Sequence, residues 1–303
     1  MLPALFHSDV ARAILGNKAT RSEVAALNHK LGYDNSLLVQ YWHYLVHLFQ
    51  GNLGISVGKN SFGVPVSGII ASGVWRTVWL ATTSLIFALA ISIPLGLVQA
   101  LRRNSKFDYT VTGLVFVVYS TPAFLLGILL ISVLSIHWSV FPPVVTNAAG
   151  TGIFGPLLDI LRQPREFILP IVVLTGLTVG GFTRYMRSSV LDSLVQDYVR
   201  TARAKGASNS RVLFRHSLRN ALIPIVTILG LTLPGLFGGA LITETLFNYP
   251  GMGLITVQAV QNNDVNTVMA ATLLIALMTI TGNLLADLGL SFVDPRVRLG
   301  GKS

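Results

Sequence analysis

Three observations predict that the chain is an all-α integral membrane protein. Hydrophobic residues make up 52% of its 303 residues and charged residues 11%, whereas soluble domains carry roughly 25% charged residues. Uncharged stretches of about the length that crosses a hydrocarbon core recur along the sequence. Lys and Arg collect between these stretches and give a net charge of +10. This distribution is typical of basic cytoplasmic loops and argues against a nucleic-acid partner.

Residues 1–76 hold no clear spanning segment, and we expect them to form an extracytoplasmic N-terminal region. Thr20 and Glu23 have the spacing of a capping box, which predicts a short helix that begins there. Residues 37–49 are uncharged and rich in aromatic residues but too short to span a bilayer. They predict a helix that lies in the membrane interface.

Metal, redox and nucleotide chemistry find little support in the sequence. The chain has no cysteine, which excludes disulfides and thiolate sites. His43 and His47 are one helical turn apart, but no third ligand is near, so we expect interfacial histidines and no metal site. The tail at 300–303 resembles part of a P-loop, yet Arg296 stands where the first glycine belongs and no helix follows.

Five spans are predicted within a permease-like domain at 77–290. Pro94 and Gly96 predict a kink near the end of the first span, and Pro122 predicts a break in the second. The third span is short, so we expect it to continue past Arg184. The five stretches are 77–100, 109–136, 167–183, 220–243 and 265–286, and the connections 137–166 and 244–264 are expected to be loops.

The distribution of basic residues orients these spans. Of the 22 Lys and Arg, 14 fall in the loop at 102–106, the segment 184–219 and the tail 291–303. The remaining eight lie on the opposite sides, six of them spread thinly over residues 1–76. Because cytoplasmic loops carry an excess of Lys and Arg, we expect the segment 184–219 and the C-terminus to be cytoplasmic.

The segment 184–219 is the most basic part of the chain and predicts a helix–turn–helix. Residues 197–205 are rich in alanine and suit a short helix. Gly206 can end that helix with a positive φ, and Ser208 or Asn209 can cap the next one.

The second helix of this segment has two predicted faces. An apolar face is predicted by residues with helical spacing: Leu213, Phe214, Leu218, Ala221 and Leu222. Basic residues four apart predict another face: Arg211, Arg215 and Arg219. An ordinary positive loop would carry the same charge, but the alanine-rich turn, the glycine and the regular arginines favour a surface for a partner.

This segment resembles the coupling ("EAA") loop of ABC-importer permeases, in the form used by dipeptide, oligopeptide and nickel importers. The family pattern is Glu-Ala-Ala, three residues, Gly, nine residues and Ile-x-Leu-Pro, and Ala202 and Gly206 match its second alanine and its glycine. Arg-Thr at 200–201 and His-Ser-Leu-Arg at 216–219 replace the other positions, as in the peptide-permease variant. The stretch 244–253 and the tail are also similar to that subfamily, and the resemblance begins at about residue 11.

The resemblance implies the membrane domain of a type I ABC importer, a multi-pass protein of a bacterial inner or plasma membrane in contact with lipid. It implies a second homologous permease subunit, two ATP-binding subunits that hold ATP and Mg²⁺, and an extracytoplasmic solute-binding protein. This chain itself would bind no cofactor and catalyse no reaction. The family has six membrane helices, and its first helix has no counterpart before residues 11–16 here, so we expect five spans.

The resemblance also implies which residues receive the motion of the ATPase subunits. They are Tyr198, Arg200, Thr201, Ala202, Arg203, Ala204, Lys205, Gly206, Arg211 and Arg215. Di- or oligopeptides are the favoured substrate class, with nickel or another small solute left open.

Polar side chains in the spans can either bond to their own helix or line a path for a peptide. The candidates for the path are Thr83, Ser120, Thr178, Thr227, Thr232 and Glu244. Glu244 lies at the end of a span, which favours placement at the interface over a proton relay. Gly176 and Gly180 predict close helix packing, within the subunit or at a seam with a second permease.

A stand-alone secondary transporter or channel is the alternative function class. Such a protein needs no ATPase, but proton coupling requires charged residues in the middle of the spans, and the sequence lacks them there. A membrane enzyme is a third class, for which no nucleophile–base pair or metal set is apparent.

Overall fold

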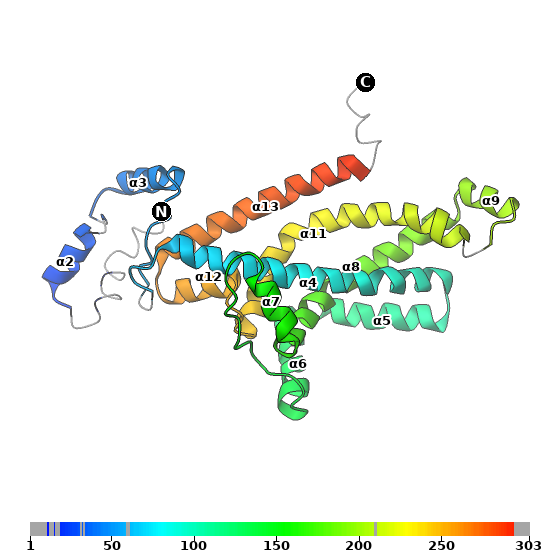
Figure 1. Ribbon diagram of the computed structural model, residues 1–303, viewed down its shortest axis with the longest axis horizontal. Coiled ribbons are helices and arrows are strands. Elements are labelled where there is room, and N and C mark those ends of the chain that lie inside the picture. Colours follow the sequence, from blue (N-terminus) through cyan, green and yellow to red (C-terminus); the bar gives the residue numbers. More distant parts are fainter. Residues whose placement is uncertain are drawn as a thin grey trace, which may run out of the picture.

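The computed structural model is an elongated bundle of helices (Figure 1). It describes residues 11, 15, 19–30, 32, 34–58, 61–208 and 211–293, without the side chains of 37, 216, 231, 233–239, 285–287 and 289–293. In this part, four helices are long and apolar enough to cross a membrane, or five if one bent pair counts as a single span. The predicted all-α class is confirmed. Residues 1–10 and the tail from 294 lie outside the described part.

The N-terminal helices agree with their local signals. Helix α2 (Arg21–Lys30) begins at the expected capping box, in which the Thr20 amide donates to Glu23 Oε2 at 2.8 Å and the Glu23 amide donates to Thr20 Oγ1 at 3.3 Å. Helix α3 (Leu37–Phe49) exposes its aromatic side chains, with Trp42 64% exposed. Such a surface is suited to the membrane interface.

Helix α4 (Val66–Leu101) begins earlier than the predicted span and continues through Pro94 without a break. Its additional N-terminal turns bury Val66 and Ile70 in a cluster with Met252 and Ala271. The sequence analysis placed the start of the span too late because Arg76 interrupts the uncharged stretch. The N-terminal turns of the helix are therefore held by packing within the protein.

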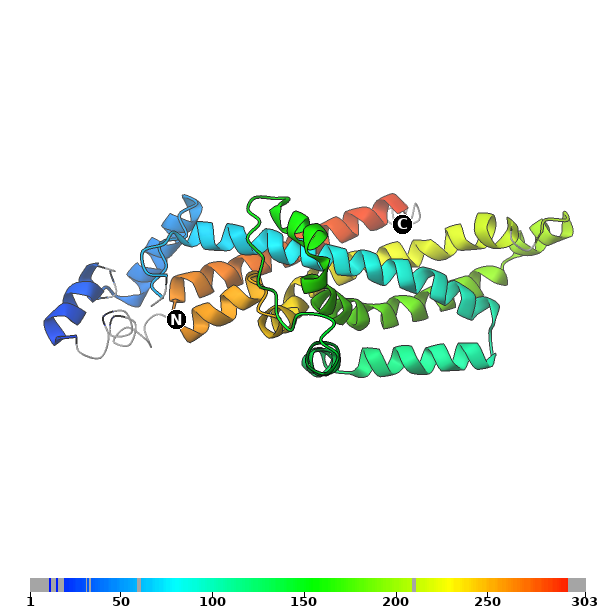
Figure 2. The same cartoon turned by 60° about the horizontal axis from the view of Figure 1, so that its bottom comes forward.

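A sharp bend lies at Thr121 and Pro122. Helix α5 (Lys106–Ser120) ends just before it, and α6 (Ala123–Leu130) with the π-helical turn η2 (Ile131–His137) runs at 103° to α5. In Figures 1 and 2, α6 stands across the long axis of the bundle. The predicted break is confirmed, but it is a right angle and not a kink within a continuous span.

The core lies where α8 (Pro164–Leu194) packs along α4 and against α11 (Leu218–Leu246). Leu85, Leu97, Phe182, Met186 and Val190 are buried there. The third span does extend past Arg184, as expected. Two short helices, α7 (Gly155–Arg162) and α12 (Met252–Gln261), occupy connections that were expected to be loops, and α13 (Val265–Val293) closes the bundle.

The glycine pair at 176 and 180 packs within this chain. A Cβ on Gly176 would lie 3.1 Å from Val118 Cγ1, and one on Gly180 would lie 2.7 Å from Tyr119 Cβ. Both neighbours belong to α5, so the pair brings α8 close to α5. This is the packing inside the subunit that the spacing allowed.

Gly96 allows α4 and α8 to approach each other, and its replacement by alanine should destabilise the protein. A Cβ there would lie 2.7 Å from the Thr183 carbonyl oxygen and 2.8 Å from Met186 Cβ. We expect a loss of about 1–3 kcal/mol, measured by thermal unfolding of the purified protein. Gly113→Ala on α5 is the matched control, because its Cβ would meet nothing within 4 Å. Equal stability of the two variants would contradict this packing.

Candidate functional site

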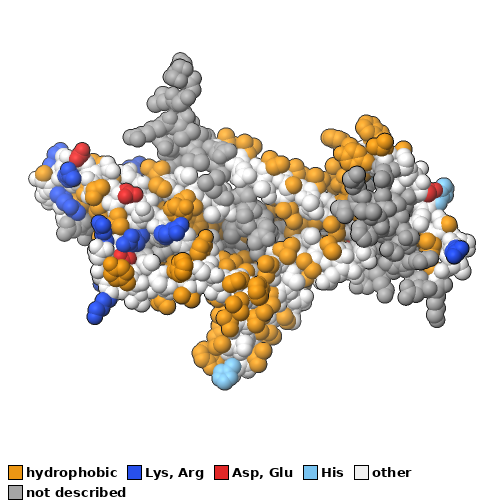
Figure 3. Space-filling view, turned by 180° about the vertical axis from the view of Figure 1, so that it is seen from behind, with side chains coloured by type: hydrophobic (Ala, Val, Ile, Leu, Met, Phe, Trp, Pro, Cys, Tyr) orange, Lys and Arg blue, Asp and Glu red, His pale blue; other side chains and the backbone are white. Residues whose placement is uncertain are grey.

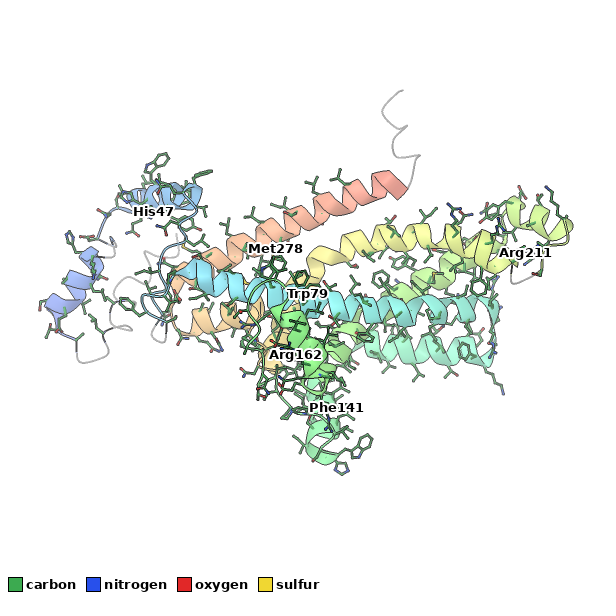
Figure 4. All side chains as sticks on the ribbon, in the orientation of Figure 1. His47, Trp79, Phe141, Arg162, Arg211 and Met278 are labelled. Atoms are coloured by element: carbon green, nitrogen blue, oxygen red, sulfur yellow. The ribbon has the colours of Figure 1, made fainter. Side chains whose placement is uncertain are left out.

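The basic segment predicted from the sequence forms one end of the molecule. Helix α9 (Asp197–Ala204) lies at that end, far from α2 and α3 at the opposite end (Figure 1). Lys and Arg side chains gather at the α9 end when the molecule is seen from behind (Figure 3). Arg211 lies at this end and is exposed, whereas His47 lies near the other end (Figure 4). The most basic segment of the sequence therefore forms a basic end on the long axis of the molecule.

Helix α9 ends in the glycine turn that the sequence predicted. Gly206 has φ +79°, its amide donates to the Arg203 carbonyl at 2.9 Å, and the Ala207 amide donates to the Ala202 carbonyl at 3.1 Å. These two bonds form a Schellman motif, which needs a residue in the left-handed region and therefore favours glycine. Ser208 begins the next helix, because its Oγ accepts from the Arg211 amide at 3.4 Å. Asn209, the other predicted cap, lies outside the described residues.

Three hydroxyl groups attach α9 to the long helices. Ser193, near the end of α8, donates to the Ser217 carbonyl at 3.2 Å and accepts from Ser217 Oγ at 2.9 Å. Its oxygen lies 2.6 Å from the Tyr198 hydroxyl, which is left to act as the donor. Val199 of α9 is fully buried. Helix α9 is therefore fixed to the end of α8 and to Ser217, the residue that precedes α11.

The outer face of α9 remains available for contact. Arg200, Thr201, Arg203, Ala204 and Lys205 are exposed, and Ala202 is half-buried. The Arg200 guanidinium is 3.6 Å from the Asp197 carboxylate, but both side chains are exposed, so this ion pair contributes little to stability. The face therefore presents cations that an acidic or carbonyl-rich partner can bind.

The apolar face predicted for residues 213–222 differs in the structure, where Val212–Ser217 form a π-helical turn, η3. Leu213 and Ala221 are buried as expected, but Phe214 is 60% exposed. A π-helix has more residues per turn than an α-helix, so α-helical spacing does not predict which side chains share a face in this turn. Arg211 and Arg215 are exposed beside it. The sequence analysis missed Phe214 as a surface residue because α-helical spacing was assumed.

The candidate path residues do not form one cluster of free polar groups. Three of them bond to carbonyls of their own helix: Thr178 to Leu174 at 2.5 Å, Thr227 to Ile223 at 3.2 Å and Thr232 to Leu229 at 2.9 Å. Ser120 lies exposed at the end of α5. Thr83 borders an apolar cavity of about 520 Å³ between α4 and α8. Their assignment to a substrate path stays a prediction.

Glu244 lies near the end of α11, as expected, but protein encloses its carboxylate completely. Its Oε1 accepts from Thr77 Oγ1 at 2.6 Å. Its Oε2 accepts from the backbone amides of Gly253 at 2.6 Å and Leu254 at 3.4 Å, at the start of α12. The carboxylate caps α12 and joins it to α4 and α11. Its placement at the membrane interface stays a prediction.

Sequence comparison places the chain in a known family. The family described as "Binding-protein-dependent transport system inner membrane component" matches residues 92–299, and its N-terminal component matches residues 1–80. The chain is 38% identical over 289 residues to the oligopeptide transport system permease protein AppB of Bacillus subtilis, covering 95% of this chain and 89% of that protein. It is 37% identical over 290 residues to the dipeptide transport system permease protein DppB of Escherichia coli K12, covering 90% and 85%.

Comparison with solved structures supports the same fold. A chain of the MetNI methionine ABC transporter in an inward-facing conformation matches with a TM-score of 0.60 and 20% identity, covering 75% of this chain and 97% of that chain. An amino acid ABC transporter matches with a TM-score of 0.55. The chain therefore belongs to the family of binding-protein-dependent transport system inner membrane components and is a membrane-spanning permease subunit of an ABC importer.

Proposed function

We propose that this permease imports di- or oligopeptides, powered by ATP that two partner ATPase subunits hydrolyse. The relatives named above support the substrate class, because they are oligopeptide and dipeptide permeases that match most of the chain. A second permease subunit completes the membrane domain, and an extracytoplasmic binding protein delivers the substrate. Nickel or another small solute is the alternative substrate. Uptake of labelled dipeptides and of nickel by the reconstituted importer separates the two.

We propose further that α9 and the turn at Gly206 sit in a groove of an ATPase subunit. The observation that carries this proposal is the combination of an exposed basic face with a rigid attachment to α8 and α11. Tyr198, Ser193 and Ser217 supply the attachment. Arg200, Arg203 and Lys205, together with Arg211, Arg215 and Phe214, supply the contacts. The end of the molecule that carries α9 and the C-terminus are then cytoplasmic.

The same arrangement supports a mechanism of coupling. When the ATPase pair closes on ATP, it displaces α9, and the hydroxyl cluster passes that displacement to α8 and α11. Helix α8 packs along α4 over much of its length, so these long helices move together. Movement of packed helices as rigid bodies is the usual basis of alternating access. Substrate released by the binding protein then leaves on the cytoplasmic side.

Cross-linking through single cysteines tests this contact, because the natural chain has no cysteine. Thr201→Cys and Lys205→Cys, on the exposed face of α9, should cross-link to an ATPase subunit in the assembled importer. Gln261→Cys, exposed at the end of α12, is the control at the other end of the molecule and should not. Absence of any cross-link from both α9 positions, in an importer that still transports, would disprove the docking of α9.

A further inference from the structure

A second cavity lies between α5 and α8, beside the end of α4, and has a volume of about 320 Å³. It is separate from the coupling surface. Its lining changes character along its length. The polar part includes Gln99, Asp108, Thr183, Arg184 and Arg187, and the apolar part includes Val115, Phe116, Tyr119, Gly180 and Gly181. The cavity is polar at one end and apolar at the other, so its lining is complementary to an amphiphilic ligand.

The polar end is built around an internal ion pair. Arg187 Nε donates to Asp108 Oδ1 at 2.9 Å and Arg187 Nη2 donates to Asp108 Oδ2 at 2.7 Å, while Asp108 is only 2% exposed. Gln99 Nε2 donates to Thr112 Oγ1 at 3.0 Å and reaches Asp108 Oδ1 at 3.4 Å. The two charges neutralise each other, so neither of them demands a ligand.

Two other groups at this end do demand one. The Thr183 side chain is 1% exposed, and its hydroxyl has no hydrogen-bond partner among the described residues. A buried hydroxyl without a partner is costly. Arg184 lines the same cavity, and no carboxylate of the described residues lies within salt-bridge distance of it; its guanidinium is 5.7 Å from the centre of the Tyr185 ring. An anionic acceptor would satisfy both.

The position of the cavity indicates the source of that anion. The polar end of the cavity lies next to the loop at 102–106, because the Asn104 amide donates to Asp108 Oδ2 at 3.0 Å. This loop carries Arg102, Arg103 and Lys106. From Asp108 to Tyr119 it follows α5 for about 16 Å, a length suited to an acyl chain. Basic pockets between membrane helices at the cytoplasmic side bind anionic lipid headgroups. A small soluble anion would leave the apolar part of the cavity unfilled.

We propose that this cavity binds one anionic phospholipid of the cytoplasmic leaflet; the choice of leaflet rests on the proposed orientation. The lipid phosphate accepts hydrogen bonds from Arg184 and Thr183, and an acyl chain lies between α5 and α8 beside Phe116 and Gly181. Because α8 leads directly into the segment that holds α9, the bound lipid braces the helix that carries the coupling surface.

A larger residue at Gly181 would fill the cavity, and its Cβ would not clash with its surroundings. A Cβ on Gly181 would meet nothing within 4 Å, so the leucine of Gly181→Leu can extend into the cavity. Gly113→Leu is the matched control, because Gly113 also lies in open space on a helix but does not line the cavity. Arg184→Gln removes the cation and leaves the cavity open.

The test is native mass spectrometry of the delipidated, complete importer titrated with phosphatidylglycerol or with phosphatidylcholine. We expect one tight phosphatidylglycerol site that phosphatidylcholine does not fill. Gly181→Leu should abolish it, and Arg184→Gln should weaken it by about tenfold, since a hydrogen bond to a charged group is lost. Gly113→Leu should bind as the natural chain does.

Two outcomes would overturn the proposal. Equal phosphatidylglycerol binding by Gly181→Leu and Gly113→Leu would mean that the lipid sits elsewhere. Displacement of the bound phosphatidylglycerol by a dipeptide would assign the anion-binding end to substrate instead of lipid. Neither outcome bears on the docking of α9, which the cysteine cross-links test separately.

Discussion

Replacing Glu244 with alanine is expected to lower the free energy of unfolding by about 3–5 kcal/mol, because it leaves buried donors without an acceptor. The carboxylate accepts from Thr77 Oγ1 and from the amides of Gly253 and Leu254. Protein encloses all of these groups, so water cannot replace the lost bonds. The melting temperature of the purified permease should fall by about 5–10 °C, followed by tryptophan fluorescence.

Thr245→Ala is the matched control for this change. Thr245 is the next residue on α11 and is exposed, and its hydroxyl donates to the Leu241 carbonyl of its own helix. It should change the melting temperature little. Glu244→Gln keeps one acceptor oxygen and should fall between the two. If Glu244→Ala melted at the same temperature as Thr245→Ala, the carboxylate would not be the joint between α4, α11 and α12.

Replacing Gly206 with valine is expected to reduce peptide uptake by more than tenfold while the importer still assembles and hydrolyses ATP. The φ of +79° at Gly206 disfavours any β-branched residue and costs about 1–3 kcal/mol. A Cβ would meet nothing within 4 Å, so the fault is confined to the turn that ends α9. The measurement is uptake of a labelled dipeptide into vesicles, with ATP hydrolysis recorded in parallel.

Gly51 offers a control with the same geometry at the opposite end of the chain. It follows α3 with φ +73°, and the Gly51 and Asn52 amides donate to the carbonyls of Leu48 and His47 as in the turn after α9. Gly51→Val therefore introduces the same strain away from the proposed ATPase contact. Equal transport by Gly51→Val and Gly206→Val, or normal uptake per ATP in Gly206→Val, would refute the special role of the α9 turn.

Local signals in the sequence predicted local structure well. The capping box at Thr20, the glycine that ends α9 and the cap at Ser208 each involve residues no more than five positions apart, and each formed as expected. The break at Pro122 was also predicted, because proline removes a donor and restricts its neighbour. These features depend on backbone chemistry that a short stretch of sequence specifies.

Features that depend on distant contacts could not be read from the sequence. The enclosure of Glu244 requires Thr77, which lies 167 positions away. The 103° direction of α6 depends on its packing against α8 and α11. Phe214 is exposed in the π-helical turn η3, and nothing in the residue types of that turn distinguishes it from an α-helix. Helix α12 was taken for a loop because its ten residues form a short apolar stretch capped by a carboxylate from α11.

The sequence therefore predicted the position and the charge of the candidate site. It did not predict the hydrogen bonds that attach α9 to the end of α8 and to Ser217. Sequence patterns identified the basic face of α9 and the Gly206 turn. They did not identify the cluster of Ser193, Tyr198 and Ser217, since serine and tyrosine at those spacings carry no distinctive signal. In the proposed mechanism, that cluster passes the displacement of α9 to α8 and α11.

A map of the complete importer, with its ATPase subunits in place, tests the central claim most directly. We predict that α9 and the turn at Gly206 lie in a groove of an ATPase subunit, with Arg200, Arg203 and Phe214 in contact with it and the bonds of Ser193 to Tyr198 and Ser217 intact. A map in which α9 is surrounded by solvent and touches no neighbouring subunit would contradict the account.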